Sequence, residues 1–177
     1  ASLWFDALRA NVESLLGLVY AAPGDVAVRS RLEALATRIT GAAAHPMGPA
    51  AFASILLAPK QEPSVGDALD ALAEVGKPVL LLYGEDDPWI VPFWARRAAD
   101  RVSAGVGEYY AISPAGHCPH HEAPAAFNTV LLNWLQRIDS NGSADNPGPP
   151  APAVGSRLSV REETPGGPRQ FEVERRL

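Results

Sequence analysis

Residues 78–89 read PVLLLYGEDDPW, and this stretch decides the fold that we expect. Its first part, residues 79–83, is a continuous apolar run, which is typical of a parallel strand covered by helices on both faces. Gly84 ends the run, and three carboxylates follow it in one turn, the last of them on Asp87. The stretch therefore predicts a buried strand that carries acidic side chains at its carboxyl end, where open α/β sheets place their ligands and chemistry.

Downstream of this turn, the sequence continues the α/β pattern. Residues 92–102 read as a helix, and residues 108–112 are rich in strand formers. A strand, a helix and a strand in this order predict a right-handed crossover with parallel strands. Residues 113–121 form a loop of Pro, Gly, His and Cys. Residues 122–138, with proline in the first turn and one apolar face, predict another helix.

Upstream of the strand, the sequence has helical patterns. Apolar residues recur at helical spacing over 8–19, 28–39 and 50–58, which predicts three helices. Asp25 is placed to cap the second of them, and a capping box at Ser64 predicts a fourth helix that leads into the strand.

The composition of the chain changes at its C-terminal end. From about Ser140 the sequence turns to Asn, Gly, Ser, Ala and Pro, and the rest mixes Arg with Glu without periodicity. Such a composition predicts a disordered tail over residues 140–177.

The overall composition limits the function classes. The 177 residues, 47% apolar and 20% charged, fit one soluble globular domain. A net charge of −5 without a basic stripe argues against nucleic acid as a partner. The sequence has no apolar stretch of about 18 residues, the length that would predict a membrane span. The single cysteine, Cys118, excludes an internal disulfide. Since the chain starts at Ala1 without a signal-peptide pattern, we expect it to be an internal piece of a longer protein.

Two residues at strand ends carry the expected chemistry. Asp87 stands three positions after Gly84, and His117 follows Gly116 beyond the second strand, so that both end a strand at the same edge. An imidazole held by a carboxylate is the base and orienting acid of a Ser-His-acid triad, here in the order Asp before His. Singly, the Asp fits an Asx turn and the His fits a backbone-bonded loop residue. The pair favours catalysis, because each residue then explains the other.

The segments LLLYGEDDPWI and SPAGHCPHHEAP resemble the last two strands of the α/β-hydrolase fold family, most like its plastid pheophytinase-like branch. The helices before residue 59, above all FASILLAP, resemble the lid of that branch. This resemblance implies a partial α/β-hydrolase fold, with a helical lid over residues 1–63 and the C-terminal part of the core over residues 64–139.

The same resemblance implies catalytic roles, with Asp87 as triad acid and His117 as triad base. It implies hydrolysis of carboxylic esters of large apolar substrates, possibly chlorophyll-type, and a chloroplast location. Where this chain has His121, relatives usually have an acidic residue, a departure that leaves the Asp and His pair unaffected.

The nucleophile of such a triad is missing from this sequence, since no serine has glycines two positions to either side. A triad without its nucleophile cannot form an acyl-enzyme. We therefore expect the chain to be inactive alone and to need the N-terminal half of the core as its partner. A parent with an Asp nucleophile, as in dehalogenase or epoxide-hydrolase chemistry, would use the same Asp and His pair and stays open.

Three other readings compete with the triad. The cluster of His117, Cys118, His120 and His121 could bind zinc, but it lacks a second ligand pair at finger spacing, and we expect neither metal nor cofactor. The three acids of residues 85–87 could serve a glycosidase or a divalent ion, but they read better as solvated turn charges. A non-catalytic binding module, with a groove between the lid helices, would not need the contact between Asp and His.

Overall fold

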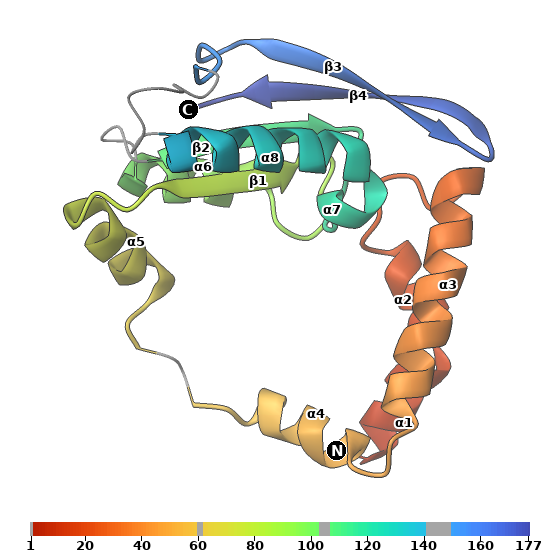
Figure 1. The fold of residues 1–177 in the computed structure, drawn as a ribbon. Coiled ribbons are helices and arrows are strands. Elements are labelled where there is room, and N and C mark those ends of the chain that lie inside the picture. The colour runs from red at the N-terminus through yellow and green to blue at the C-terminus, as the bar shows by residue number, and fades with distance from the viewer. Residues whose placement is uncertain (1, 60–61, 103–106, 141–149) are drawn as a thin grey trace.

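The computed structural model describes residues 2–59, 62–102, 107–140 and 150–177. Figure 1 shows four strands in one open sheet, with α8 in front of it, α6 behind it, and α1 to α4 set apart. None of the helices within the described ranges is both long and apolar enough to cross a membrane. Along the chain the elements are α1 (Ser2–Ala10), α2 (Val12–Gly17), α3 (Val26–Ala43), α4 (Gly48–Leu56), α5 (Val65–Glu74), β1 (Val79–Gly84), α6 (Pro92–Val102), β2 (Gly107–Ser113), α7 (Pro119–Glu122), α8 (Pro124–Ser140), β3 (Arg157–Thr164) and β4 (Gly167–Arg175).

The crossover predicted from the sequence is present, because β1 pairs in parallel with β2, Leu81 lying opposite Tyr109. The burial of β1 is lower than predicted, since its residues are half-buried from Val79 to Tyr83. Leu80 and Leu82 pack on the core, but among the described residues no strand pairs with the outer edge of β1. The strand order is β1-β2-β4-β3, so the buried strand is β2.

The helix signals predicted upstream are largely confirmed. Asp25 accepts hydrogen bonds from the amides of Ala27 and Val28, and Ser64 forms the expected capping box with Asp67. The single helix predicted over residues 8–19 is instead α1 and α2, which break at Asn11. The Asn11 side chain donates to the Ala7 carbonyl at 2.8 Å, and such a bond competes with the helical backbone.

The prediction of a disordered tail over residues 140–177 is wrong for residues 150–177, and residues 141–149 lie outside the described part of the chain. β3 and β4 form an antiparallel hairpin, and β4 pairs antiparallel with β2, Ile112 lying opposite Val173. Phe171 and Val173 are buried, and the charged Glu172 between them is exposed, so the alternation of a half-buried strand is present there.

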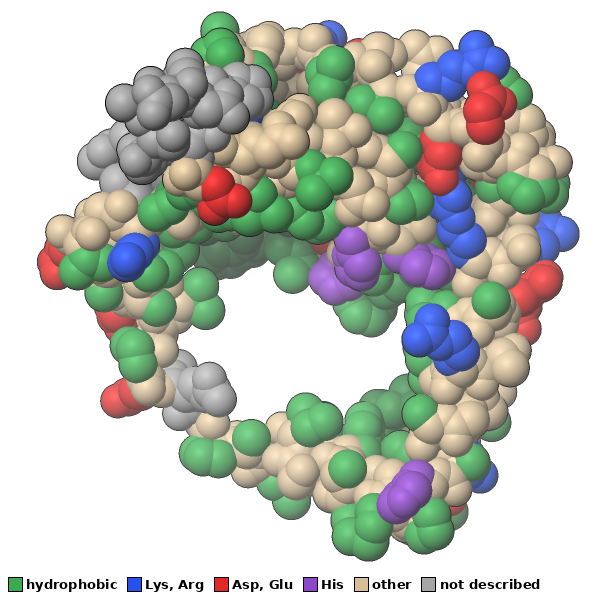
Figure 2. All heavy atoms as spheres, viewed as in Figure 1, with side chains coloured by type: hydrophobic (Ala, Val, Ile, Leu, Met, Phe, Trp, Pro, Cys, Tyr) green, Lys and Arg blue, Asp and Glu red, His purple; other side chains and the backbone are tan. Residues whose placement is uncertain are grey.

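The main core lies between the sheet and α8, and β4 contributes directly to it. Its buried members come from β2, α8, β4 and the loop between β2 and α8: Tyr110, Ile112, Ala115, Ala123, Ala126, Val130, Phe171 and Val173. A second, smaller cluster joins α2 to α3: Val19, Tyr20, Val28 and Leu32. The sheet region and the helices α1 to α4 therefore have separate cores, and Figure 2 shows the opening between them. The assignment of residues 1–63 as a lid and 64–139 as core stays a prediction.

Because the hairpin completes the core, Phe171→Ala is expected to lower the free energy of unfolding by about 3 to 5 kcal/mol. Phe171 is fully buried, so its removal leaves a cavity in the sheet face. Urea unfolding followed by circular dichroism measures the change. Leu158→Ala on the same hairpin, where the side chain is 45% exposed, is the control and should change it by less than about 1 kcal/mol. A wild-type urea midpoint for Phe171→Ala would contradict a structural role for the hairpin.

Candidate active site

Asp87 and His117 meet at the carboxyl edge of the two parallel strands. His117 Nδ1 and Asp87 Oδ2 are 2.9 Å apart, so the predicted contact is present. The Asp87 side chain is 4% exposed, whereas that of His117 is 34% exposed. The carboxylate is thus shielded from water, and part of the imidazole remains open to a reacting group.

The other carboxylate oxygen of Asp87 forms a local turn. Oδ1 accepts from the Trp89 amide at 2.8 Å and from the Ile90 amide at 3.0 Å. Oδ1 of Asp87 therefore forms the Asx turn, and Oδ2 forms the contact with His117. Burial of the carboxyl group acts to raise the pKa of Asp87, but these amides and His117 outweigh it, and the pKa lies below its usual value. An ionised Asp87 accepts a hydrogen bond from Nδ1–H of His117 and so leaves Nε2 as the basic nitrogen.

This lowered pKa of Asp87 has a consequence for stability. A group whose pKa is depressed on folding contributes stability above its unfolded-state pKa, and loses it as the pH falls through the folded-state pKa. The difference in unfolding free energy between wild type and Asp87→Asn should therefore be constant above about pH 5 and shrink below about pH 4. Urea unfolding across this pH range measures it. A difference that does not change with pH would contradict the lowered pKa of Asp87.

Glycines bring the two strand ends together. A Cβ on Gly84 would lie 2.0 Å from the Gly116 carbonyl oxygen and 2.5 Å from that of Ala115. A Cβ on Gly116 would lie 2.7 Å from both the Ala21 nitrogen and the Val19 oxygen. Contacts this short leave no room for a side chain, so glycine at both positions is what permits the loops of Asp87 and His117 to approach.

Glu122 is a site residue that the sequence analysis missed, since it was treated as the first residue of a helix. Its side chain is buried and accepts from the Gly116 amide and the Ala21 amide, each at 2.8 Å. Burial raises the pKa of Glu122, and the backbone hydrogen bonds oppose that rise. The His117 amide, next to Gly116, donates to the Val19 carbonyl at 2.9 Å. These bonds tie the His117 loop to the segment between α2 and α3.

The other members of the cluster that was considered as a zinc site have other partners. His121 Nδ1 lies 2.7 Å from the Tyr20 hydroxyl, and the His120 ring packs against Phe127. Cys118 is half-buried, and burial with the nearby Glu122 raises the pKa of its thiol. Within residues 2–59, 62–102, 107–140 and 150–177, no group of three or more metal-binding side chains converges.

The acidic turn is also divided among different partners. Glu85 pairs with Arg176 at 2.7 Å, and Asp86 accepts from the Ser113 hydroxyl at 3.2 Å. With Asp87 bonded to His117, the three carboxylates do not point at one common ligand. The interpretation of these acids as solvated turn charges is wrong, because each of them has a protein partner and the Asp87 side chain is buried.

An apolar pocket of about 300 Å³ lies against the N-terminal helices. Trp89 lines it, and the Trp89 ring centroid is 5.5 Å from that of His117. The rest of the lining comes mainly from α1, α2 and α3, with Phe52 from α4, and it includes Phe5, Leu8, Val12 and Leu16. The pocket therefore approaches the imidazole only through Trp89, and neither Asp87 nor His117 lines it.

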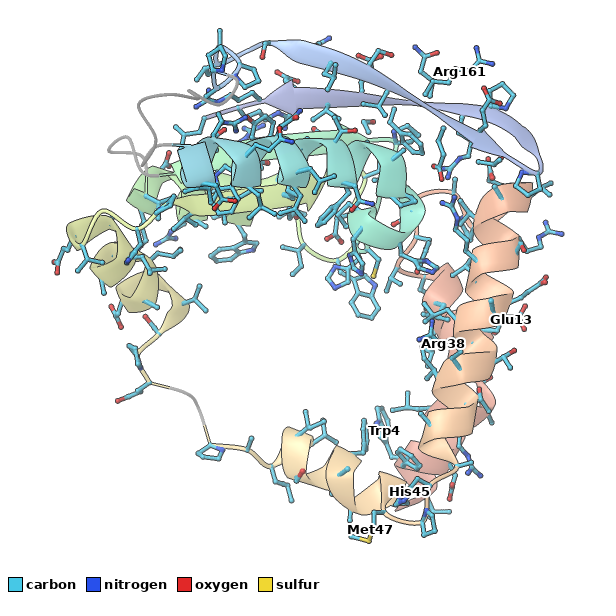
Figure 3. All side chains as sticks on the ribbon, viewed as in Figure 1. Trp4, Glu13, Arg38, His45, Met47 and Arg161 are labelled. Carbon is cyan, nitrogen blue, oxygen red and sulfur yellow. The ribbon has the colours of Figure 1, made fainter. Side chains whose placement is uncertain are left out.

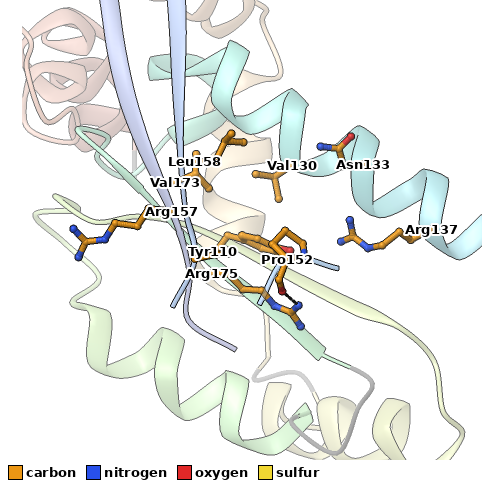
Figure 4. Close-up of a pocket in the computed structure, with 10 residues that line it drawn as sticks. Tyr110, Val130, Asn133, Arg137, Pro152, Arg157, Leu158, Val173 and Arg175 are labelled. Carbon is orange, nitrogen blue, oxygen red and sulfur yellow. Dashed lines mark hydrogen bonds between the residues drawn. The ribbon is translucent and has the colours of Figure 1, made fainter. Parts of the chain in front are cut away.

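A second pocket, of about 320 Å³, lies between α8 and the hairpin (Figure 4). Its lining includes Tyr110, Arg137 and Arg175 but neither Asp87 nor His117. Arg137 pairs with Glu108, and Arg175 donates to backbone carbonyls, so both arginines of this pocket already have protein partners. We therefore do not place the active site there.

Comparison with known proteins gives two matches. A family model described as "Alpha/beta hydrolase family" matches residues 3–130, which include Asp87, His117 and Glu122 and end before the hairpin. The chain is 40% identical over 106 residues to "Pheophytinase, chloroplastic" of Arabidopsis thaliana, and the match covers 60% of this chain and 22% of the relative. No solved structure matches.

Proposed function

Because the chain belongs to the alpha/beta hydrolase family, we propose that Asp87 and His117 are the acid and base of a serine esterase. His117 Nε2 takes the proton of the nucleophile and passes it to the leaving alcohol, while Asp87 holds the tautomer and stabilises the imidazolium. The observation that carries this proposal is the 2.9 Å contact between a buried carboxylate and a partly exposed imidazole.

The proposed substrates are carboxylic esters of large apolar molecules, of the chlorophyll type. The apolar pocket lined by Trp89 supports this choice, because its lining offers hydrophobic contact and almost no polar group. The similarity to a chloroplastic pheophytinase supports it too, and on the same ground we propose a chloroplast location.

The proposed partner is the N-terminal half of the hydrolase core, which would supply the serine. The edge of β1 that faces away from β2 has unpaired backbone groups among the described strands, and such an edge accepts another strand. Histidine side chains lie at the upper margin of the central opening (Figure 2). The chain spans about a fifth of the pheophytinase that it matches.

The test joins the pheophytinase sequence that precedes the match to the front of this chain. We expect the joined protein to hydrolyse a chromogenic ester and a chlorophyll-type ester, with no change on adding a chelator, and the 177 residues alone to be inactive. Turnover by the 177 residues alone would refute the proposal that the nucleophile lies outside this chain. A joined protein that is folded by circular dichroism but hydrolyses neither ester would refute the esterase.

A further inference from the structure

The hairpin of β3 and β4 contacts the chain shortly after His117, at Glu122. Its far end lies over the start of α3 (Figure 1), and it lies outside residues 3–130, which the family model matches. Arg169 on β4 donates from Nη1 to the Glu122 carbonyl at 2.8 Å, and its Nε lies 3.6 Å from Asp25 Oδ2. The Arg169 side chain is 11% exposed, and its guanidinium stacks on the Phe171 ring. Arg169 is thus held firmly against the loop before α8.

A second arginine reaches the same carbonyl from α3. Arg31 donates from Nη1 to the carbonyls of His121 and Glu122 at 3.3 and 3.2 Å, and its Nη2 forms an ion pair with Glu162 on β3. Hydrogen bonds with a charged donor are about twice as strong as neutral ones. The Glu122 backbone is therefore clamped between α3 and the hairpin.

The Glu122 side chain connects this clamped backbone to the loop of His117. Its carboxylate holds the amides of Gly116 and Ala21, and the His117 amide bonds to Val19 in the same segment. We propose that Arg169, with Arg31, is a positioning residue for His117, acting through Glu122. The proposal rests on the proposed function in that it assigns His117 the role of base.

The charge of Arg169 strengthens this effect. Burial raises the pKa of Glu122, and the nearby positive charge of Arg169 opposes the rise, so that it favours the carboxylate. A carboxylate accepts from the Gly116 amide more strongly than a protonated acid does. Without Arg169, the loop loses both a direct bond to the Glu122 carbonyl and part of the hold of Glu122 on Gly116.

Amide hydrogen exchange in the 177-residue chain tests this without any turnover. We expect Arg169→Ala to speed the exchange of the Gly116, His117 and Ala21 amides by about tenfold, and to leave the paired amides of β1 and β2 unchanged. Arg161→Ala is the matched control. Arg161 loses the same charge from the same hairpin, but it is exposed, pairs with Glu163 and points away from the molecule (Figure 3).

Two results would overturn the proposal. One is wild-type exchange at the three amides in Arg169→Ala, and the other is an increase shared equally by β1 and β2, which would indicate general destabilisation. Arg169→Lys keeps the charge but loses the several donors of the guanidinium group, so it should increase the exchange of the three amides to an intermediate extent. This variant decides the question if Arg169→Ala does not fold. Wild-type exchange in Arg169→Lys would then refute the proposal. An inactive joined protein with the expected exchange pattern would refute the function alone.

Discussion

Replacing His117 with Ala in the joined protein is expected to lower kcat for a chromogenic ester by about 10⁵-fold or more. The variant removes the nitrogen that takes the proton of the nucleophile. His121 bonds to Tyr20 and His120 packs on Phe127, so neither can take its place. His120→Ala and His121→Ala are therefore matched controls, and each should cost less than about tenfold.

The pattern among these three variants separates a triad from a metal site. In a metal site each ligand is needed to bind the metal, and activity depends on the bound metal. The three histidine variants would then lower kcat to the same extent. Equal losses, or inhibition by a chelator, would contradict the role of His117 as a triad base.

Asp87→Asn is expected to lower kcat by about 10⁴-fold. An Asn oxygen can still accept from the Trp89 and Ile90 amides, so the turn is kept. An Asn amide, however, donates to Nδ1 of His117, and the proton then sits on Nε2, where the base is required. The neighbouring change Asp86→Asn is the control, because Asp86 bonds to Ser113 instead of His117, and it should cost less than about tenfold. A loss for Asp86→Asn as large as for Asp87→Asn would point to the charge of the turn, not to tautomer control.

The contact of Asp87 with His117 could be predicted because each of its determinants is local. A strand, a helix and a strand predict a parallel pair, and residues that follow the ends of parallel strands share one edge. The caps at Asp25 and Ser64 were predictable for the same reason, since a capping residue bonds to amides two or three positions on.

The features that were missed depend on distant partners. Glu122 bonds to Ala21, 101 positions away, and nothing near Glu122 in the sequence distinguishes it from an exposed acid. The hairpin was missed because Arg and Glu dominate it, and its two buried apolar residues in β4, Phe171 and Val173, gain their partner only when β2 lies beside them. The composition of such a strand reflects its many solvent-facing residues more than the few residues that are buried.

The most direct test of the proposed function is a double-variant cycle on Asp87 and His117 in the joined protein. If the carboxylate acts only through the imidazole, the variant that combines Asp87→Asn with His117→Ala should have a kcat within about twofold of His117→Ala alone. The measurement is ester hydrolysis by wild type, both single variants and the double variant, each first shown to be folded. Losses that multiply in the double variant would show that the two residues act independently, and would contradict the acid and base pair.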